Sequence, residues 1–356
     1  MPTTIPAFLR NPQLTGYVRT TDVPKNYLFE RWCPSEGVEA DEFEGLVVLD
    51  QVQMAPFVAV DAESPKINGD LMSSYKWQVA FMRHKARFKE SDLRVFWEPG
   101  VDDPNTLAFA SSRARETKIR RTIDALSMGV DARKEWVFWN AMAGSVAYDD
   151  ENIQYEVNFD GAYIGSSNRK TPDTLWSAAS PTPITDLSDW IEEISDESGI
   201  DEWIMVTTPK VLGLLSRSEQ VRQMWSVFRS NPAAAEPDSL NPVTPVQVSG
   251  AMQQLGIMEV IKYTAKYTSL TYAVNKTATR TKTRFINDND IFLLPANQQL
   301  GRFASAPAMA NNWMSGKFGW NKQETDPWVL EVGAGEYAWI DFPPPMHNSV
   351  LQARVA

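Results

Sequence analysis

A long stretch without proline constrains the fold of this chain more than any other feature of its sequence. The chain has 23 prolines, but none lies between Pro104 and Pro172. Asp103 is a favourable N-cap, and Pro104 suits the first helical position. After these residues comes an apolar stripe with the three- and four-residue spacing of one face of a helix. Its members are Ile119, Ile123, Leu126, Val130, Val137 and Ala141. The pattern predicts one helix from Pro104 to Ala143.

Such a helix would be about 60 Å long at ~1.5 Å per residue. A compact sphere built from 356 residues would be only about 50 Å across. The helix is therefore at least as long as the expected globule is wide, and we predict an elongated subunit built along it. Lys and Arg gather in its first half, where Glu116 is placed to pair with Arg120 one turn later. This basic cluster consists of Arg113, Arg115, Lys118, Arg120 and Arg121.

The composition argues against several classes of protein. The net charge of −11 makes the chain a poor candidate for wrapping nucleic acid, which requires clustered Lys and Arg. No run of about 18 apolar residues is present, so we predict no membrane span. The N-terminal sequence "MPTTIPAFLRNPQ" has two prolines and no apolar core, unlike a secretory signal. Cys33 is the single cysteine, which rules out an internal disulfide and favours a reducing cytoplasm.

Catalytic and metal-binding chemistry has few side chains to use. The two histidines, His84 and His347, lie in no motif, and we expect both to be structural or solvated. A Cys/His zinc site would lack ligands, and a Ser-His-Asp arrangement would have to recruit one of these two histidines. The segment "GAYIGSSN" lacks the lysine and the spacing of a phosphate-binding loop. We therefore predict no catalytic, cofactor-binding or metal-binding residue and no enzymatic activity.

Residues 64–97 have the pattern of a long β-hairpin. Asn68-Gly69 is a strong turn pair, and strict alternation from Trp77 to Lys89 predicts a single strand. At ~3.3 Å per residue that strand would be about 40 Å long, and such a ribbon is not stable alone in water. We expect it to lie on an acidic surface, because one face carries a basic stripe of Arg83, Lys85, Arg87 and Lys89.

The first 45 residues look like an arm, with scattered prolines and few periodic apolar positions. We expect such a segment to be ordered only by a surface against which it lies. The end of the arm is acidic, with Glu36, Glu39, Asp41, Glu42 and Glu44.

A second acidic run, from Asp186 to Glu202, has eight carboxylates and no Lys or Arg.

Residues 171–310 alternate between short helices and strands, which predicts an inserted α/β lobe. Strands are expected at "DEWIMVTT", "GIMEVIKYTAKYT", "LTYAVN" and "DIFLLP". Before this lobe, "SVAYDDENIQYEVNFDGAYIG" reads as a hairpin around Asp149-Asp150. After it, "PWVLEV", "EYAWIDF" and "SVLQARV" read as three separate strands. Helix starts are expected at the capping residues Asp186, Thr208, Ser218 and Thr244.

The order of these elements resembles that of the major capsid proteins of tailed bacteriophages, in the lambda major head protein family. "DDPNTLAFASSRARETKIRRTIDALSMGVDARKEWVFWNAMAGSVAY" is similar to the family's spine helix, and "DEWIMVTTPKVLGLL" to a strand and helix of its axial lobe. "DPWVLEVGAGEYAWIDFPPPMHNSVLQARV" resembles its closing strands. The resemblance covers most of residues 45–356, through order and spacing more than identity. It implies an α+β chain with the Hong Kong 97-like capsid fold.

The resemblance also implies a division of the chain. Residues 1–45 would be the N-terminal arm and residues 64–97 an extended loop reaching over a neighbouring subunit. Residues 171–305 would be the axial domain at the centre of each pentamer or hexamer. The peripheral domain would combine residues 46–63, 98–170 and 306–356.

By the same resemblance, the chain would be a structural protein of the virion, assembled in the host bacterial cytoplasm into an icosahedral shell around double-stranded DNA. The shell would consist of hexamers and pentamers of the chain, with a separate scaffolding protein and a portal protein as partners. A decoration protein at the three-fold sites is left open. No cofactor is implied.

Charge suggests which surfaces meet in such a shell. We hypothesise that the basic stripe pairs across a subunit boundary with the acidic arm or with the run that contains Glu192 and Glu193. Each exposed ion pair contributes only about 0–1 kcal/mol, so repetition over many copies would make the contact matter. Solvated charged faces are the alternative. For the basic cluster of the long helix, we expect pairing within or between subunits and at most weak contact with packaged DNA.

Two other functions are left open by the sequence. An encapsulin-type shell would assemble without scaffolding and enclose a cargo protein instead of a genome. A carbohydrate-active protein could use some of the 13 tryptophans for stacking on sugars and a pair of carboxylates for hydrolysis. Trp136 and Trp139 share a face of the long helix, however, and we expect them to pack in a core.

Overall fold

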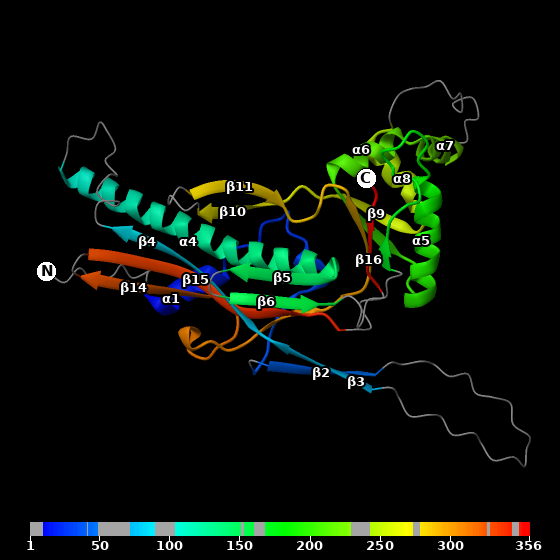
Figure 1. Ribbon diagram of the computed structural model, residues 1–356. Helices are drawn as coiled ribbons and strands as arrows, with labels where there is room; N and C mark the ends of the chain where they lie inside the picture. Colours follow the sequence, from blue (N-terminus) through cyan, green and yellow to red (C-terminus); the bar gives the residue numbers. More distant parts are fainter. Residues whose placement is uncertain are drawn as a thin grey trace, which may run out of the picture.

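Over the described residues the chain has an elongated body, with one long helix, α4 (Pro104–Met142), running along it (Figure 1). A lobe of short helices around a second sheet lies at one end of this body (Figure 1). In the part of the chain described here, no helix is long and apolar enough to cross a membrane. The computed structural model describes residues 10–40, 42–48, 72–89, 104–150, 153–159, 168–228, 243–272, 278–325, 328–343 and 349–356.

Helix α4 confirms the predicted long helix almost to its last residue. Its 39 residues measure about 58 Å at ~1.5 Å per residue. Every member of the predicted apolar stripe is at most 5% exposed, and the helix packs against two strands of the main sheet. Burial of this stripe stabilises the long helix more than the helical propensity of its residues does.

The main sheet is built around β15 (Trp328–Asp341), a strand of 14 residues. Strand β4 (Ala80–Lys89) pairs antiparallel with one edge of β15 over ten residues. Strands β14 (Phe318–Thr325) and β13 (Arg302–Ser305) pair antiparallel with the other edge. Strands β4 and β15 therefore lie side by side in one sheet, although about 240 residues separate their paired positions in sequence.

The prediction of separate strands at "PWVLEV" and "EYAWIDF" is wrong, because β15 continues through the glycines between them. A Cβ at Gly333 would lie 2.3–2.6 Å from three atoms of the Trp320 indole on the paired strand β14. The glycine permits this close approach of the ring to the backbone, and it does not mark a turn.

The N-terminal segment lies on the chain's own body, which corrects the expectation that it needs another surface. Helix α1 (Asn11–Arg19) packs on β14 and α4, and its Leu14 is fully buried. Helix α2 (Phe29–Trp32) lies in the main core, where Trp32 donates its indole N–H to the carbonyl of Pro295 at 2.8 Å. Strand β1 (Ser35–Gly37) then pairs parallel with β13. Apolar residues without clear periodicity provide this docking.

The single strand predicted from Trp77 to Lys89 is also wrong. It is divided at Val79 into β3 (Met72–Gln78), which pairs with β2 (Glu42–Val48), and β4, which joins the main sheet. Val79 is 2% exposed in the core, at the point where the chain enters the body. The alternation of side chains is the same in both strands, so it could not show where one partner is exchanged for another. The predicted turn at Asn68-Gly69 lies outside the described residues.

The α/β lobe predicted from the sequence is present and has a core of its own. Its mixed sheet has the strand order β7-β16-β12-β8-β9. The strands are β7 (Arg169–Lys170), β8 (Trp203–Thr207), β9 (Ile257–Lys262), β12 (Asp290–Pro295) and β16 (Leu351–Arg354). The helices are α5 (Pro183–Ser198), α6 (Pro209–Arg217), α7 (Glu219–Phe228) and α8 (Pro245–Gln253).

Three of the predicted helix starts in this lobe are confirmed, and one is wrong. Helix α5 begins at Pro183 and not after Asp186. The carboxylate of Asp186 accepts a hydrogen bond from the Trp176 indole at 2.8 Å in the first turn. The confirmed starts follow Thr208, Ser218 and Thr244.

The last strand of the chain belongs to the lobe, in contrast to its predicted place with residues 306–343 in the body. Strand β16 pairs antiparallel with β12 and parallel with β7. Leu351 and Ala353 are fully buried in the core of the lobe. The C-terminal segment therefore links the two cores.

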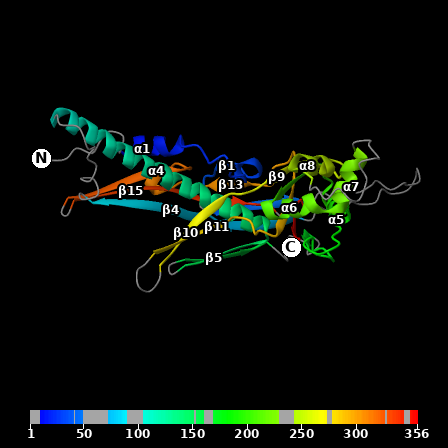
Figure 2. The same ribbon diagram turned by 90° about the horizontal axis from the view of Figure 1, so that it is seen from above.

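Two antiparallel ribbons accompany the long helix (Figures 1 and 2). The first, β5 (Ser145–Asp150) with β6 (Ile153–Asn158), confirms the hairpin predicted after the helix, but Asp149 and Asp150, the predicted turn, are the last two residues of β5. The second is formed by β10 (Lys266–Tyr272) and β11 (Ala278–Arg284). A single-turn helix, η4 (Met309–Asn311), precedes β14.

Two glycines test how tightly this fold is packed. A Cβ at Gly301 would lie 2.2 Å from the backbone carbonyl oxygen of Asp341, whereas nothing lies within 4 Å of one at Gly213 in α6. We expect Gly301→Ala to lower the free energy of unfolding by about 1–3 kcal/mol, because backbone must move. Gly213→Ala should raise it by up to ~1 kcal/mol through helix propensity. Urea denaturation of the unassembled subunit measures both; equal midpoints for the two variants would contradict the prediction.

Candidate assembly surfaces

The β2–β3 ribbon leaves the body on the side opposite α4 (Figure 1). Its strands pair over seven residues, from Glu42 opposite Gln78 to Val48 opposite Met72. Within the described ranges no third strand pairs with it. Two strands alone are marginally stable in water, so this ribbon is a surface that a partner can complete.

The basic stripe lies on β4 inside the main sheet and not on the projecting ribbon. Lys85 is 3.4 Å from Glu331, and Arg87 lies 4.0 Å from Glu331 and 3.9 Å from Glu324. Lys85 and Arg87 are more than half exposed all the same. These two residues thus have acidic neighbours in their own chain, and their predicted contact across a subunit boundary stays a prediction.

The ends of the stripe differ from its middle. The Arg83 guanidinium stacks over the rings of Phe81 at 5.1 Å and Trp320 at 5.0 Å. Lys89, at the other end, is exposed at the last position of β4. His84 lies between them, also exposed, against Gly129 of α4. The arrangement gives His84 a packing role; His347 lies outside the described residues.

The acidic residues predicted to face the stripe are dispersed. Glu36 pairs with Arg302 at 3.0 Å, and Glu39 lies beside an open groove described below. Glu42 is exposed at the start of β2; Asp41 and the side chain of Glu44 lie outside the described residues. On α5, Glu192 and Glu193 are both exposed, and Glu193 pairs with Lys170.

The basic cluster of the long helix is partly engaged with its own chain. Arg120 pairs with Glu116 at 2.6 Å, as predicted, and lies 5.5 Å from the centre of the Tyr17 ring. Lys118 is half-buried and Arg121 is exposed. The side chains of Arg113 and Arg115 lie outside the described residues. Contact of this cluster with DNA stays a prediction.

A buried polar cluster on α4 was not predicted. The Lys134 ammonium is 2.5 Å from Glu336 on β15, with both side chains 2% exposed, and donates to the Ser35 hydroxyl at 2.9 Å. The rings of Phe29 and Phe303 flank it at 5.9 and 5.8 Å. A charge this deep is stable only because it is paired and hydrogen-bonded.

The next residue of α4, Glu135, binds the N-terminal segment. Its carboxylate accepts the backbone N–H groups of Leu28 at 3.0 Å and Phe29 at 2.9 Å, at the start of α2. It also accepts the Trp139 indole N–H at 2.7 Å and the Tyr263 hydroxyl. Burial raises the pKa of Glu135 despite these four donors. Glu135 therefore ties together the N-terminal segment, the long helix and the entrance to the lobe.

The signal for this cluster was present in the sequence. Asp131, Lys134 and Glu135 are spaced three and one apart, within the turns that carry the apolar stripe. All three are at most 1% exposed, and Asp131 pairs with Lys317 before β14. Lys134 reads as an interruption of the stripe in the sequence, but it is a continuation of the buried face.

An apolar protrusion lies between β13 and β14. Trp313 is 71% and Met309 78% exposed. Asn312 and Trp313 have φ of 54° and 60°, in the left-handed region that side chains with a Cβ rarely adopt. The buried Asn311 amide stabilises this turn by donating to the carbonyl of Met314 at 2.6 Å. The strained turn thus displays a large indole to solvent, which is typical of an interaction site.

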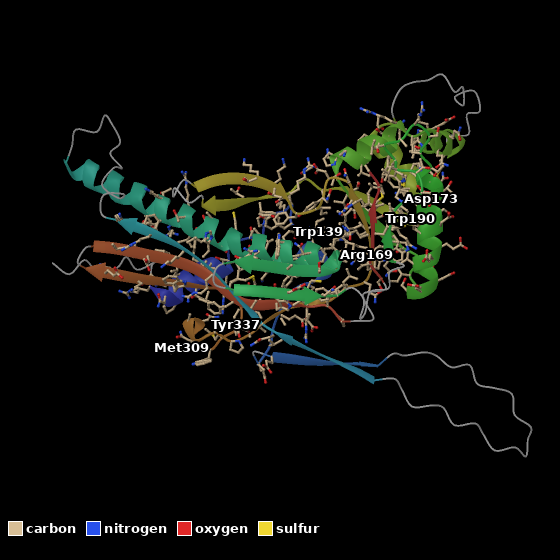
Figure 3. All side chains as sticks on the ribbon, viewed as in Figure 1. Trp139, Arg169, Asp173, Trp190, Met309 and Tyr337 are labelled. Carbon is tan, nitrogen blue, oxygen red and sulfur yellow. The ribbon has the colours of Figure 1, made fainter. Side chains whose placement is uncertain are left out.

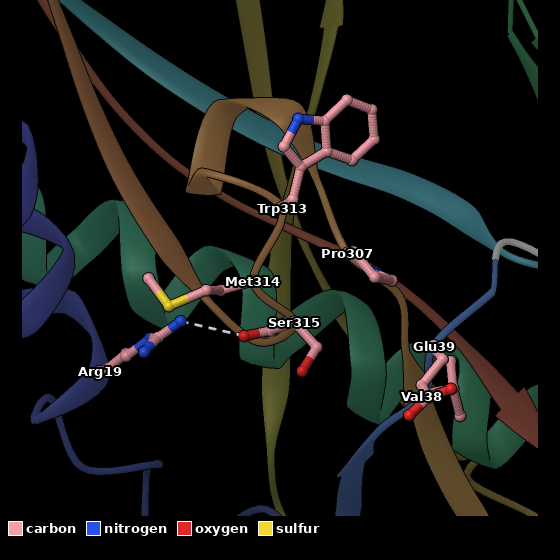
Figure 4. A pocket seen from close by; sticks show the side chains of 7 residues that line it. All are labelled: Arg19, Val38, Glu39, Pro307, Trp313, Met314 and Ser315. Atoms are coloured by element: carbon pink, nitrogen blue, oxygen red, sulfur yellow. Dashed lines mark hydrogen bonds between the residues drawn. The ribbon is translucent and has the colours of Figure 1, made fainter.

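Beside this protrusion runs an open groove of about 500 Å³ (Figure 4). Arg19 lines it and donates to the carbonyl of Ser315 at 2.9 Å. The groove is lined by Arg19, Val38, Glu39, Pro307, Trp313, Met314 and Ser315. Residues of the N-terminal segment and of the protrusion therefore line the groove together.

The described tryptophans of the core do not line a sugar-binding cleft. Figure 3 places Trp139 inside the body and Trp190 inside the lobe, and they are 1% and 8% exposed. Trp190 stacks on Trp176 with ring centres 6.2 Å apart. In the described part of the chain, no group of three or more His, Cys, Asp or Glu side chains could hold a metal ion.

Solved structures with similar architecture identify the fold. A protein assigned as the capsid protein of a prophage in Escherichia coli CFT073 matches with a TM-score of 0.56 at 16% identity, over 98% of this chain and 99% of that one. A phage-related protein from Bordetella bronchiseptica RB50 matches with a TM-score of 0.50 at 10% identity, over 98% and 97%. The chain has the Hong Kong 97-like capsid fold, in the α+β class.

The family follows from the sequence match. The model of the family described as phage major capsid protein E matches residues 12–327. The chain belongs to this family: it is a major capsid protein, a structural and non-enzymatic component of the phage head shell. No curated protein matches it in sequence. Membership decides between the readings that the sequence left open, in favour of the phage capsid over the encapsulin and the carbohydrate-active protein.

Proposed function

We propose that copies of this chain assemble as hexamers and pentamers into an icosahedral shell around the double-stranded DNA of a tailed phage. The observation that carries the proposal is the β2–β3 ribbon, which projects from the body as two strands without a third among the described residues. A neighbouring subunit would supply the surface that this ribbon needs.

The ribbon replaces residues 64–97 as the extended loop. It begins at Glu42 and returns at Gln78, so the loop would start earlier and end earlier than the sequence suggested. The main sheet with α4 would be the peripheral domain. The lobe would be the axial domain at the centre of each hexamer or pentamer, with β16 as part of it.

The assembly partners would be a separate scaffolding protein and a portal protein. The resemblance to the lambda type supports both, and it leaves a decoration protein at the three-fold sites open. The exposed Trp313 and Met309 are a candidate contact for any of these proteins or for a second copy of the chain.

Shortening the ribbon tests the proposal. Residues 46–74 are replaced by a two-residue Asn-Gly turn, and the chain is expressed with its genomic neighbours. We expect the variant subunit to keep its unfolding midpoint, because its cores lie elsewhere, and the yield of closed shells to fall at least about tenfold. Sedimentation and negative-stain microscopy measure the shells.

Two outcomes contradict different parts of the proposal. Normal shells from the shortened chain would show that the ribbon is not an assembly contact. A wild-type chain that stays monomeric beside its genomic neighbours at high concentration would contradict the assembly itself. Gly213→Ala, which leaves the ribbon intact, serves as the matched control.

A further inference from the structure

A positively charged segment stands out in this acidic chain. Residues 260–287 contain six Lys or Arg and no Asp or Glu, whereas the whole chain carries a net charge of −11. Half of this segment forms the two strands of the β10–β11 ribbon, which pairs with no other strand among the described residues. The ribbon is thus a basic surface distinct from the basic stripe on β4.

The two faces of this ribbon have different environments. Tyr267 points to the body, where its ring lies 5.1 Å from that of Phe285 at the edge of the main core. On the opposite face, Lys266 and Thr268 follow each other at the two-residue spacing of a strand, and Lys282 pairs in register with Thr268. Lys266, Thr268 and Lys282 are exposed, so this second face presents two ammonium groups to solvent.

Helix α5 of the lobe carries the complementary charge. Leu187, Trp190 and Ile194 bury one side of it. The other side is an acidic stripe at three- and four-residue spacing, and its residues are all exposed: Asp189, Glu192, Glu193 and Asp196. Lys170 pairs with Glu193, which leaves most of the stripe facing solvent.

Lengths and positions of the two surfaces agree with a contact between copies. A strand of seven residues spans about 23 Å and a helix of 16 residues about 24 Å. The acidic helix lies at the outer edge of the lobe, whereas the ribbon extends the other way over α4 (Figures 1 and 2). Two surfaces on opposite sides of one subunit cannot touch each other, but each can contact its counterpart on a neighbouring copy. Such head-to-tail contacts build rings.

We propose that the exposed face of the β10–β11 ribbon docks on the acidic stripe of α5 in the adjacent copy around each ring. The inference rests on the proposed function and adds a pair of surfaces that join neighbouring subunits. Duplex DNA is the other polyanion available to a basic ribbon. The matching lengths of the two surfaces and their placement on opposite sides of the subunit favour the second copy.

A charge-swap experiment tests the contact in the full-length chain. We expect K266E/K282E to lower the shell yield about tenfold at low salt, because like charges then meet across the boundary. The variant E192K/D196K should have a similar effect. The combination of all four substitutions should restore most of the yield, since opposite charges face each other again. The control R10E/K25E makes the same change in net charge on the N-terminal segment and should leave the yield within about twofold.

The outcomes separate the partners. Recovery of the shell yield in the variant with all four substitutions supports docking between copies. An additive loss of yield without recovery overturns it. Normal yield of empty shells from K266E/K282E, combined with weaker binding of a 20-base-pair duplex by the subunit, would assign the ribbon to DNA. If the wild-type chain forms no shells at all, the proposed function fails and not this contact alone. Unfolding midpoints of the unassembled variants exclude misfolding as the cause.

Discussion

Replacing Lys134 by Met is expected to lower the free energy of unfolding of the subunit by about 3–5 kcal/mol. The substitution keeps the length of the side chain but leaves Glu336 buried, at 2% side-chain exposure, without its partner. The Ser35 hydroxyl also loses its donor, and the segment around β1 loses a link to α4. Urea denaturation of the unassembled subunit measures the change.

The second substitution Glu336→Leu should recover much of this loss in the double variant. Well-packed apolar residues often replace a buried ion pair without net cost, because the desolvation of both charges is removed. Lys322→Met is the matched control, since Lys322 pairs with Glu324 at 2.8 Å at an exposed site. Its midpoint should equal that of the wild type. If Lys134→Met shifted the unfolding midpoint no more than the control does, the buried pair would have no structural role.

Replacing Glu135 by Ala is expected to have an effect of similar size, about 3–5 kcal/mol, for a different reason. The backbone N–H groups of Leu28 and Phe29 at the start of α2, the Trp139 indole and the Tyr263 hydroxyl would lose their common acceptor. Each buried donor without a partner costs about 1–3 kcal/mol, and relaxation reduces the sum. Because two of the donors belong to the N-terminal segment, limited proteolysis should cut residues 10–28 faster than in the wild type. Equal cutting rates would show that apolar burial alone holds the segment.

Glu135→Gln isolates the charge of this carboxylate. Its pKa is raised by burial in the folded subunit, so the folded state binds more protons than the unfolded state between the ordinary and the raised pKa. The stability of the wild type relative to Glu135→Gln should therefore be greatest below the ordinary pKa and fall as the pH rises through the raised one. Unfolding midpoints of both proteins, measured across pH 4–7, give the difference in stability. The lower limit is set by the ordinary pKa of a carboxyl group, ~4. A difference that grows with pH would show that the four hydrogen bonds outweigh burial.

The residues that were hard to assign from the sequence share one property: their partners are distant in the chain. Lys134 meets Glu336 about 200 residues away, and Arg87 meets Glu331 about 240 residues away. A charged residue within an apolar stripe reads as solvated unless its partner is known. For the same reason the N-terminal segment looked unsupported, although Phe29 and Trp32 are buried in the main core.

The sequence alone determined the long helix, the lobe with three of its helix starts and the order of elements that identifies a capsid protein. These features depend on periodicity and capping, which act between residues a few positions apart. Only the tertiary structure decided that β4 leaves the projecting ribbon for the main sheet, that β16 joins the lobe, and that the N-terminal segment docks on its own body. The backbone of any strand offers two hydrogen-bonding edges, and side-chain alternation does not specify their partners. Apolar residues likewise pack on any complementary face, so only the assembled core selects among these partners.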